Sequence, residues 1–118
     1  MKLLVTAVFA AALAVPAATA ALKAPAANTL TGTVGPGFTI KLTQNGTPVK
    51  KLKAGKYTIK IADKAIDHNF HLKGPGVNKK TSVAAKINTT WNVTLEKGKY
   101  TYVCDPHLTF MKGSFTVS

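Results

Sequence analysis

Apolar and polar residues alternate in short segments from Leu30 to the end of the chain. Apolar positions recur at every second residue in segments 38–42, 57–61, 68–72, 91–95, 100–104 and 115–117. This period of two predicts β-strands that each bury one face. Turn signals such as Asn45-Gly46 and Gly74-Pro75-Gly76 separate the segments, and no stretch of useful length has a helical period. About seven short strands with turns at this spacing predict an all-β sandwich or barrel.

The N-terminal 20 residues have the pattern of a secretory signal peptide. Lys2 precedes the apolar run Leu3–Val15, and Ala18 and Ala20 are the small residues of a cleavage site before Ala21. The apolar run is too short to span a membrane. We therefore expect residues 1–20 to be removed on export to the periplasm or the medium. A flexible, Ala/Pro-rich lead-in over 21–29 and one folded domain over 30–118 should remain.

The chain is strongly basic, with 16 basic residues against 4 acidic ones and a formal net charge of +12. Removal of Lys2 with the signal peptide lowers this charge by one, to +11. Every basic residue is a lysine, and the lysines are scattered rather than grouped with aromatic residues, which speaks against nucleic-acid binding. The excess charge favours attraction to acidic proteins or anionic membrane surfaces. We expect a monomer without stable membrane insertion.

The C-terminal segment 102–113 combines side chains that bind soft metal ions. It contains the single cysteine of the chain, Cys104, followed by His107 and by Met111, the only methionine besides the first residue. One cysteine cannot form an internal disulfide, so the thiol is an intermolecular partner, a reactive liability or a ligand. A buried and inert cysteine is the plain alternative. The neighbouring imidazole and thioether favour a ligand.

A second imidazole completes this set. In the predicted strands, alternation directs both Cys104 and His68 into the sandwich, near the end that loop 105–112 would cover. Two histidines, a thiolate and a weak axial methionine form the arrangement that copper favours. His71 falls on the opposite face of its segment from His68, so we do not expect it to be a ligand.

Three other types of site use some of these residues. Zinc sites use cysteine, histidine and carboxylate ligands, which leaves Met111 without a role. A hydrolase with Cys104 and His107 would lack an obvious group to orient the histidine, and His68 would have no role. A copper carrier without a redox role binds the same ion, but such carriers tend to expose Met-rich or His-rich tracts, which this chain lacks.

The ordered set of motifs resembles the cupredoxins, the small blue copper proteins, and is most similar to the plastocyanin, amicyanin and pseudoazurin branch. The resemblance covers roughly residues 30–118. It is carried by Ala54-Gly55-Lys56-Tyr57, His68-Asn69, the segment 95–104, Cys104-Asp105-Pro106-His107 and Met111-Lys112-Gly113. It implies a Greek-key β-sandwich of about seven or eight strands.

The same resemblance implies roles for particular residues. One copper ion, cycling between Cu(I) and Cu(II), would be bound by His68, Cys104 and His107, with Met111 as the axial ligand. Asn69 would tie its strand to the backbone after Cys104, where Asp105 replaces the Ser or Thr common in relatives. Three residues separate His107 from Met111, whereas amicyanin-like loops have two there and plastocyanin-like loops have four.

The implied function is single-electron transfer between redox proteins, without enzymatic activity. A site whose ligands all come from the protein leaves no open position for a substrate, which catalytic metal sites normally keep. We expect His107 to be the electron gateway, inside an apolar rim of Pro106, Leu108, Phe110 and the Gly74-Pro75-Gly76 turn. Nearby lysines, Lys73 and Lys112 in particular with Lys79 and Lys80, would attract a partner with an acidic docking surface.

Overall fold

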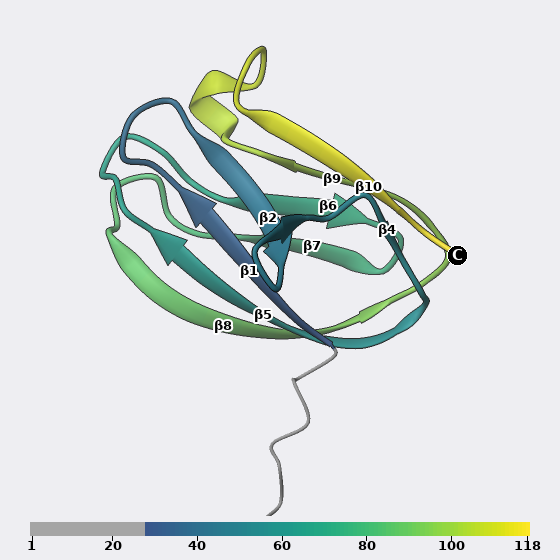
Figure 1. The fold of residues 1–118 in the computed structure, drawn as a ribbon. Helices are drawn as coiled ribbons and strands as arrows, with labels where there is room; N and C mark the ends of the chain where they lie inside the picture. Colours follow the sequence, from purple (N-terminus) through teal and green to yellow (C-terminus); the bar gives the residue numbers. More distant parts are fainter. Residues whose placement is uncertain (1–27) are drawn as a thin grey trace, which may run out of the picture.

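The computed structural model describes residues 28–118, which form two β-sheets packed face to face (Figure 1). One sheet has the order β3-β2-β1-β5-β8, with strands β1 (Thr29–Val34), β2 (Ile40–Gln44), β3 (Thr47–Pro48), β5 (Gly55–Asp63) and β8 (Ile87–Leu95). The other has the order β4-β10-β9-β6-β7, with strands β4 (Lys51–Leu52), β6 (His71–Gly74), β7 (Val77–Lys80), β9 (Gly98–Val103) and β10 (Lys112–Val117). The all-β sandwich predicted from the alternation is confirmed.

Both sheets are mixed, because β1 pairs with β5 and β4 with β10 in parallel, while the other pairs are antiparallel. The described residues form ten strands rather than seven or eight. The excess comes largely from β3 and β4, which are two residues long and too short to show a period. A single 3-10 turn, η1 (Asp105–His107), interrupts the β-structure of this part of the chain. None of its helical turns is long and apolar enough to cross a membrane.

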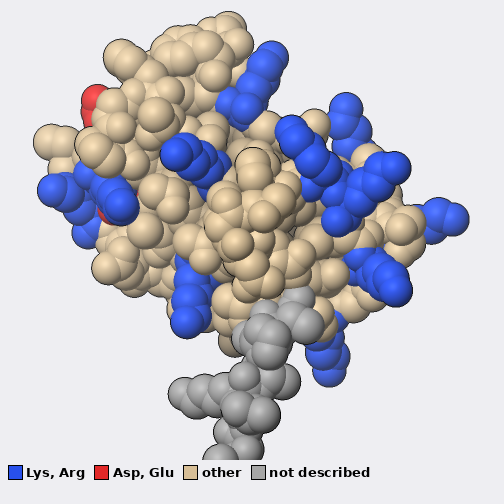
Figure 2. Space-filling view, in the orientation of Figure 1, with Lys and Arg blue, Asp and Glu red and all other residues tan. Residues whose placement is uncertain are grey.

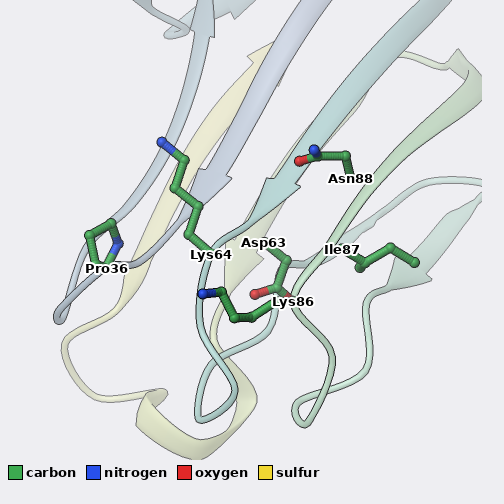
Figure 3. A pocket seen from close by; sticks show the side chains of 6 residues that line it. All are labelled: Pro36, Asp63, Lys64, Lys86, Ile87 and Asn88. Atoms are coloured by element: carbon green, nitrogen blue, oxygen red, sulfur yellow. The ribbon is translucent and has the colours of Figure 1, made fainter.

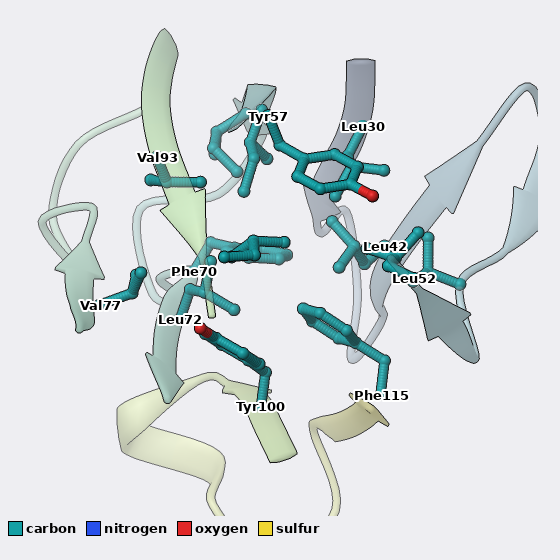
Figure 4. Packing of buried hydrophobic residues seen from close by; sticks show 14 of the residues in the cluster. Leu30, Leu42, Leu52, Tyr57, Phe70, Leu72, Val77, Val93, Tyr100 and Phe115 are labelled. Atoms are coloured by element: carbon teal, nitrogen blue, oxygen red, sulfur yellow. The ribbon is translucent and has the colours of Figure 1, made fainter. Parts of the chain in front are cut away.

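The core lies between the sheets and is built from the inward residues of the alternating segments (Figure 4). Aromatic pairs stack within it: Phe70 lies 5.6 Å from Tyr102 and Tyr100 lies 5.2 Å from Phe115, measured between ring centroids. A Cβ atom on Gly113 would come within 2.2 Å of the Tyr102 ring. Glycine at that position therefore lets the ring lie flat against β10, directly below the loop that carries Met111.

Phe38 is a departure from the predicted pattern. The alternation places it on the inward face of a strand, but β2 begins only at Ile40 and Phe38 is 64% exposed. Gly35 and Gly37 have φ angles of 66° and 72°, values that favour glycine, and the Gly35 amide donates to the Thr39 carbonyl at 2.8 Å. This tight turn occupies residues that the alternation assigned to the strand, and it directs Phe38 away from the core.

The turn Gly74-Pro75-Gly76 lies at the opposite end of the molecule from the expected rim around His107. His71 pairs with Val103 and Lys73 with Thr101, so β6 runs away from Cys104 toward the start of β9. The Tyr100 hydroxyl donates to the Pro75 carbonyl at 2.7 Å, which fixes the turn beside Gly98. The turn therefore cannot belong to a rim around His107.

Candidate metal centre

The two sheets bring their loops together at one end of the sandwich. Val34, Asp63 and Ile87 lie side by side where β1 and β5 end and β8 begins. In the other sheet, His71 and Lys112 both pair with Val103, the last residue of β9. Segments 35–39, 64–70, 81–86 and 104–111 therefore meet at this end, which we call the loop end.

Cys104 and His107 are fixed by the short loop between β9 and β10. The Cys104 amide donates to the Met111 carbonyl at 3.0 Å, and the Met111 amide donates to the His107 carbonyl at 2.9 Å. Pro106 stands in the first turn of η1, where its missing N–H costs nothing. These bonds close the loop on itself and hold the thiol and the imidazole on the same side.

His68 reaches the same point from the segment between β5 and β6. The alternation predicts that His68 opens a strand, but β6 begins only at His71, so His68 belongs to a loop. Its side chain is nevertheless buried, with 2% exposure. A Cβ atom on Gly35 would lie 3.7 Å from the His68 ring and 2.9 Å from Ala65, so the turn after β1 packs closely against this loop.

Three potential ligand atoms from these segments form a compact triangle. The Nδ1 atoms of His68 and His107 are 3.1 Å apart, and the Cys104 Sγ atom lies 3.7 Å from the first and 3.5 Å from the second. The point in their plane equidistant from all three atoms is about 2.0 Å from each, close to usual metal–nitrogen distances and slightly below metal–sulfur distances. Among the described residues, these three form the group of His, Cys or acidic side chains suited to hold a metal ion.

Met111 adjoins this triangle through its backbone bond to Cys104, and its side chain is 1% exposed. A buried thioether beside two imidazoles and a thiol suits copper, because soft sulfur and imidazole donors together favour that metal. The donor set therefore fits a copper ion. The axial role of Met111 stays a prediction.

Asn69 connects the two loops that hold the triangle. Its Oδ1 accepts a hydrogen bond from the Asp105 amide at 2.7 Å, the bond expected from the sequence, and its Nδ2 donates to the Asp105 carboxylate at 2.8 Å. Nδ2 also donates a hydrogen bond to the Thr81 carbonyl at 3.3 Å. The residue after His68 is thus bonded to the residue after Cys104 at two points.

His71 holds the same carboxylate from the other side. Its Nδ1 donates to Asp105 at 2.8 Å, and its Nε2 lies 2.6 Å from the Asn78 side-chain oxygen. Burial alone would raise the pKa of Asp105, but the hydrogen bonds from Asn69 and His71 and the attraction of His71 and Lys80 lower it below its ordinary value. His71 lies outside the triangle, as its strand face predicts. Sequence reasoning missed its contact with Asp105, although a half-buried carboxylate beside Cys104 needs such a partner.

Exposed apolar side chains surround His107, which is itself half-buried. The Phe38 ring lies 5.1 Å from the His107 ring and 5.4 Å from each of the His68 and Phe110 rings, measured between centroids. Phe38, Leu108 and Phe110 are 64%, 54% and 58% exposed, and Pro106 is exposed as well. Sequence reasoning did not identify Phe38 as a surface residue beside His107, because the alternation of segment 38–42 assigned it to the inward face of a strand.

A hollow at the part of the loop end formed by β1, β5 and β8 has a different composition (Figure 3). It is lined by Pro36, Asp63, Lys64, Lys86, Ile87 and Asn88. The Asp63 carboxylate there accepts hydrogen bonds from the Thr81 hydroxyl at 2.7 Å and the Ala65 amide at 3.3 Å. This hollow contains none of the four expected ligands, and its acidic group is already engaged within the fold.

Known proteins similar to this chain point to the same chemistry. A family model described as copper binding proteins of the plastocyanin/azurin family matches residues 33–118. The chain is 38% identical over 114 residues to amicyanin-alpha of Methylorubrum extorquens, a match that covers 92% of this chain and 95% of the relative. A solved structure of rusticyanin from Thiobacillus ferrooxidans is 21% identical and has a TM-score of 0.55 over 76% of each chain. A solved structure of reduced rusticyanin is 23% identical, with a TM-score of 0.56 over 76% of this chain and 78% of that one. The rusticyanin structures share the fold.

Proposed function

The chain belongs to the plastocyanin/azurin family of copper-binding proteins, the cupredoxins, and we propose that it is an exported protein that shuttles single electrons between redox partners. In this proposal His68, Cys104 and His107 hold the copper ion, and Met111 is its axial ligand. The observation that best supports this copper site is the triangle of the Cys104 Sγ atom and the two histidine Nδ1 atoms, with sides of 3.1, 3.5 and 3.7 Å.

Bound copper supplies the one-electron chemistry by cycling between Cu(I) and Cu(II). The contribution of the chain is to keep the donor atoms in place, because the two oxidation states prefer different geometries and a loose site would rearrange at each transfer. Asn69 ties the His68 loop to the Cys104 loop, and the backbone bonds of Met111 close the latter. Bonds of this kind orient metal ligands and limit their movement.

Surface composition supports the loop end as the place where partners dock. The large exposed hydrophobic residues of the described chain are Phe38, Ile66, Ile87, Leu108 and Phe110. All of them lie in, or at the edge of, the loops that meet there. An apolar group of this kind, surrounded by polar surface, is typical of an interaction site. His107, half-buried among these residues, is therefore the proposed gateway for the electron.

Export and the nature of the partner rest on the sequence. The signal peptide expected over 1–20 and most of the lead-in expected over 21–29 lie outside the described residues. We propose a periplasmic or secreted monomer whose positive charge attracts redox partners with acidic docking surfaces.

A visible spectrum of the Cu(II)-loaded protein, followed through a redox titration, tests the function. We expect an intense thiolate-to-copper absorption that disappears on reduction and returns on reoxidation. Cys104→Ser should lose this absorption while far-ultraviolet circular dichroism still reports an all-β fold, because a hydroxyl oxygen does not replace the thiolate. Thr101→Ser, an outward substitution on the same strand, is the matched control and should keep the colour. Copper that binds without reversible redox cycling, or colour that persists in Cys104→Ser, would refute the proposal.

A further inference from the structure

The outer face of the sheet β4-β10-β9-β6-β7 carries a group of lysines. Residues paired across neighbouring strands point to the same side of a sheet. Because Leu52, Leu72, Tyr100, Phe115 and Val117 are buried on the inner side, their neighbours along each strand point outward. The outward positions include Lys51, Lys73, Lys80, Lys99 and Lys112, all of them exposed. We call this set the lysine face.

These lysines are spread over three rows of the sheet. Lys51 and Lys99 both pair with Thr116, and Lys73 pairs with Thr101 in the next row. Lys112 pairs with Val103 in the row nearest the metal centre, and Lys80 pairs with His71 in the same row. With strands about 4.8 Å apart and about 3.4 Å per residue, Lys73 lies roughly 8 Å from Lys99. This spacing is close to the screening length of about 8 Å at physiological ionic strength, so the charges act together.

In the described chain, no outward position on the strands of this sheet is occupied by an acidic residue that would offset the lysine charges. Asp105 lies just beyond Val103, and its carboxylate is already bonded to Asn69 and His71. Between β9 and β10 the face has a shallow hollow lined by Lys99, Thr101, Val103, Lys112, Gly113 and Ser114. Two ammonium groups and two hydroxyls at one hollow are donors suited to carboxylate oxygens.

We infer that the lysine face is a second docking surface, distinct from the apolar loop end, and that it binds the acidic surface of a partner protein. The inference rests on the proposed function for the identity of that partner as a redox protein. Carboxylate side chains of the partner contact Lys73 and Lys99 and enter the hollow beside Thr101. Lysine presents a mobile point charge, which suits brief encounters better than the rigid fork of arginine.

The composition of the face favours a protein over other polyanions. A membrane-binding surface places large apolar or aromatic side chains into the lipid, whereas the one apolar side chain lining the hollow is Val103, which is half-buried. Single-stranded nucleic acid is held by aromatic stacking together with basic groups, and the outward strand positions of this face carry no Phe, Tyr or Trp. Lysine ammonium groups and the small hydroxyl side chains beside them are hydrogen-bond donors suited to the carboxylates of a protein partner.

Lysines elsewhere on the molecule provide an internal control. Figure 2 shows one side of the surface, on which lysines are scattered and acidic groups are scarce. On the outer face of the other sheet, Lys41 pairs with Thr33 and Lys60 pairs with Thr31. The double variant Lys41→Glu/Lys60→Glu therefore changes the net charge as much as Lys73→Glu/Lys99→Glu does, but on the opposite side.

The test measures binding of poly-L-glutamate to the Cu(I)-loaded protein by nuclear magnetic resonance of backbone amides, so it requires no electron transfer. We expect shifts centred on residues 71–73, 99–103 and 112–116. In Lys73→Glu/Lys99→Glu the Kd should rise roughly tenfold, because two attractions become two repulsions and each exposed charge pair is worth roughly a factor of two. The control pair should change log Kd by less than half as much. Both double variants, loaded with Cu(II) in a separate sample, should keep the visible absorption spectrum of the metal centre.

Equal effects of the two double variants would overturn the inference and leave a diffuse attraction to net charge. Shifts centred on the apolar loop end would overturn it as well. Binding to vesicles containing phosphatidylserine that is stronger than binding to poly-L-glutamate, and sensitive to Lys73 and Lys99, would replace the protein partner with a membrane. Failure of reversible redox cycling would refute the proposed function without changing these binding results, so the two failures are distinguishable.

Discussion

Replacing Asn69 by alanine should loosen the connection between the two loops that hold the metal ligands. The side chain is 1% exposed, and its bonds to Asp105 and Thr81 would all be lost. Each such bond contributes roughly 0.5–1.5 kcal/mol, and a polar group left buried without a partner costs roughly 1–3 kcal/mol. Because water reaches the half-buried Asp105 and replaces part of the loss, we expect the free energy of unfolding to fall by about 2–4 kcal/mol.

Urea denaturation of the copper-free protein measures this loss, and a competition titration with a chelator measures the affinity for copper. We expect copper affinity to fall roughly 10–100-fold, the range typical for residues that orient metal ligands. Asn92→Ala is the matched control, because Asn92 is exposed and accepts one bond from the Thr58 hydroxyl at 3.1 Å. A loss below about 1 kcal/mol in Asn69→Ala, with unchanged copper affinity, would show that the inter-loop bonds do not hold the site together.

Three further predictions test the roles of neighbouring residues. If Met111 is the axial ligand, Met111→Leu should raise the reduction potential and Met111→Gln should lower it, because the amide oxygen is a harder donor that favours Cu(II); equal potentials in voltammetry would exclude that role. His68→Ala should abolish tight copper binding in a chelator titration, whereas His71→Ala should keep the copper and its colour but lower the unfolding midpoint; the opposite result would reverse the assignment. Because the folded-state pKa of Asp105 is lowered, its contribution to stability is fully present above the ordinary carboxyl pKa and is lost as the pH falls through the lowered value. Urea midpoints of copper-free wild type and Asp105→Asn should therefore converge on acidification, and a constant difference would contradict the assignment.

The strands could be predicted where burial follows a strict period of two. Tyr57, Ile59 and Ile61 alternate with polar residues and are all buried in β5. Tyr100 is buried in β9, and Cys104, the residue directly after that strand, is buried as well. The sequence of such a segment determines which of its faces is buried, because a one-residue slip in strand pairing would expose every apolar side chain. The same regularity correctly separated His68 from His71, although β6 itself begins only at His71.

The site was predictable in its chemistry but not in its connections. Cysteine, histidine and methionine at short spacing indicate copper from the residue types alone. The contact of His71 with Asp105 joins residues 34 positions apart, and its existence depends on how β6 and β9 align. The position of the Gly74-Pro75-Gly76 turn depends on the direction of β6, which an alternating pattern does not encode.

Phe38 shows why the proposed docking surface was the hardest part to predict. A strand pattern treats every apolar residue as a candidate for the core, since burying a phenylalanine side chain gains roughly 1.5–3 kcal/mol. Single exposed hydrophobic residues are common and have no significance by themselves. Here the five large exposed hydrophobic residues of the described chain, Phe38 among them, lie at the edge or within the loops of one end, while the outward strand positions of the lysine face carry mostly Lys, Thr and Ser. The fold thus leaves large apolar side chains exposed at the end where His107 reaches the surface, and it presents lysines on a neighbouring face. In the proposed function, this separation lets the protein attract its partner through lysines and transfer the electron through an apolar contact at His107.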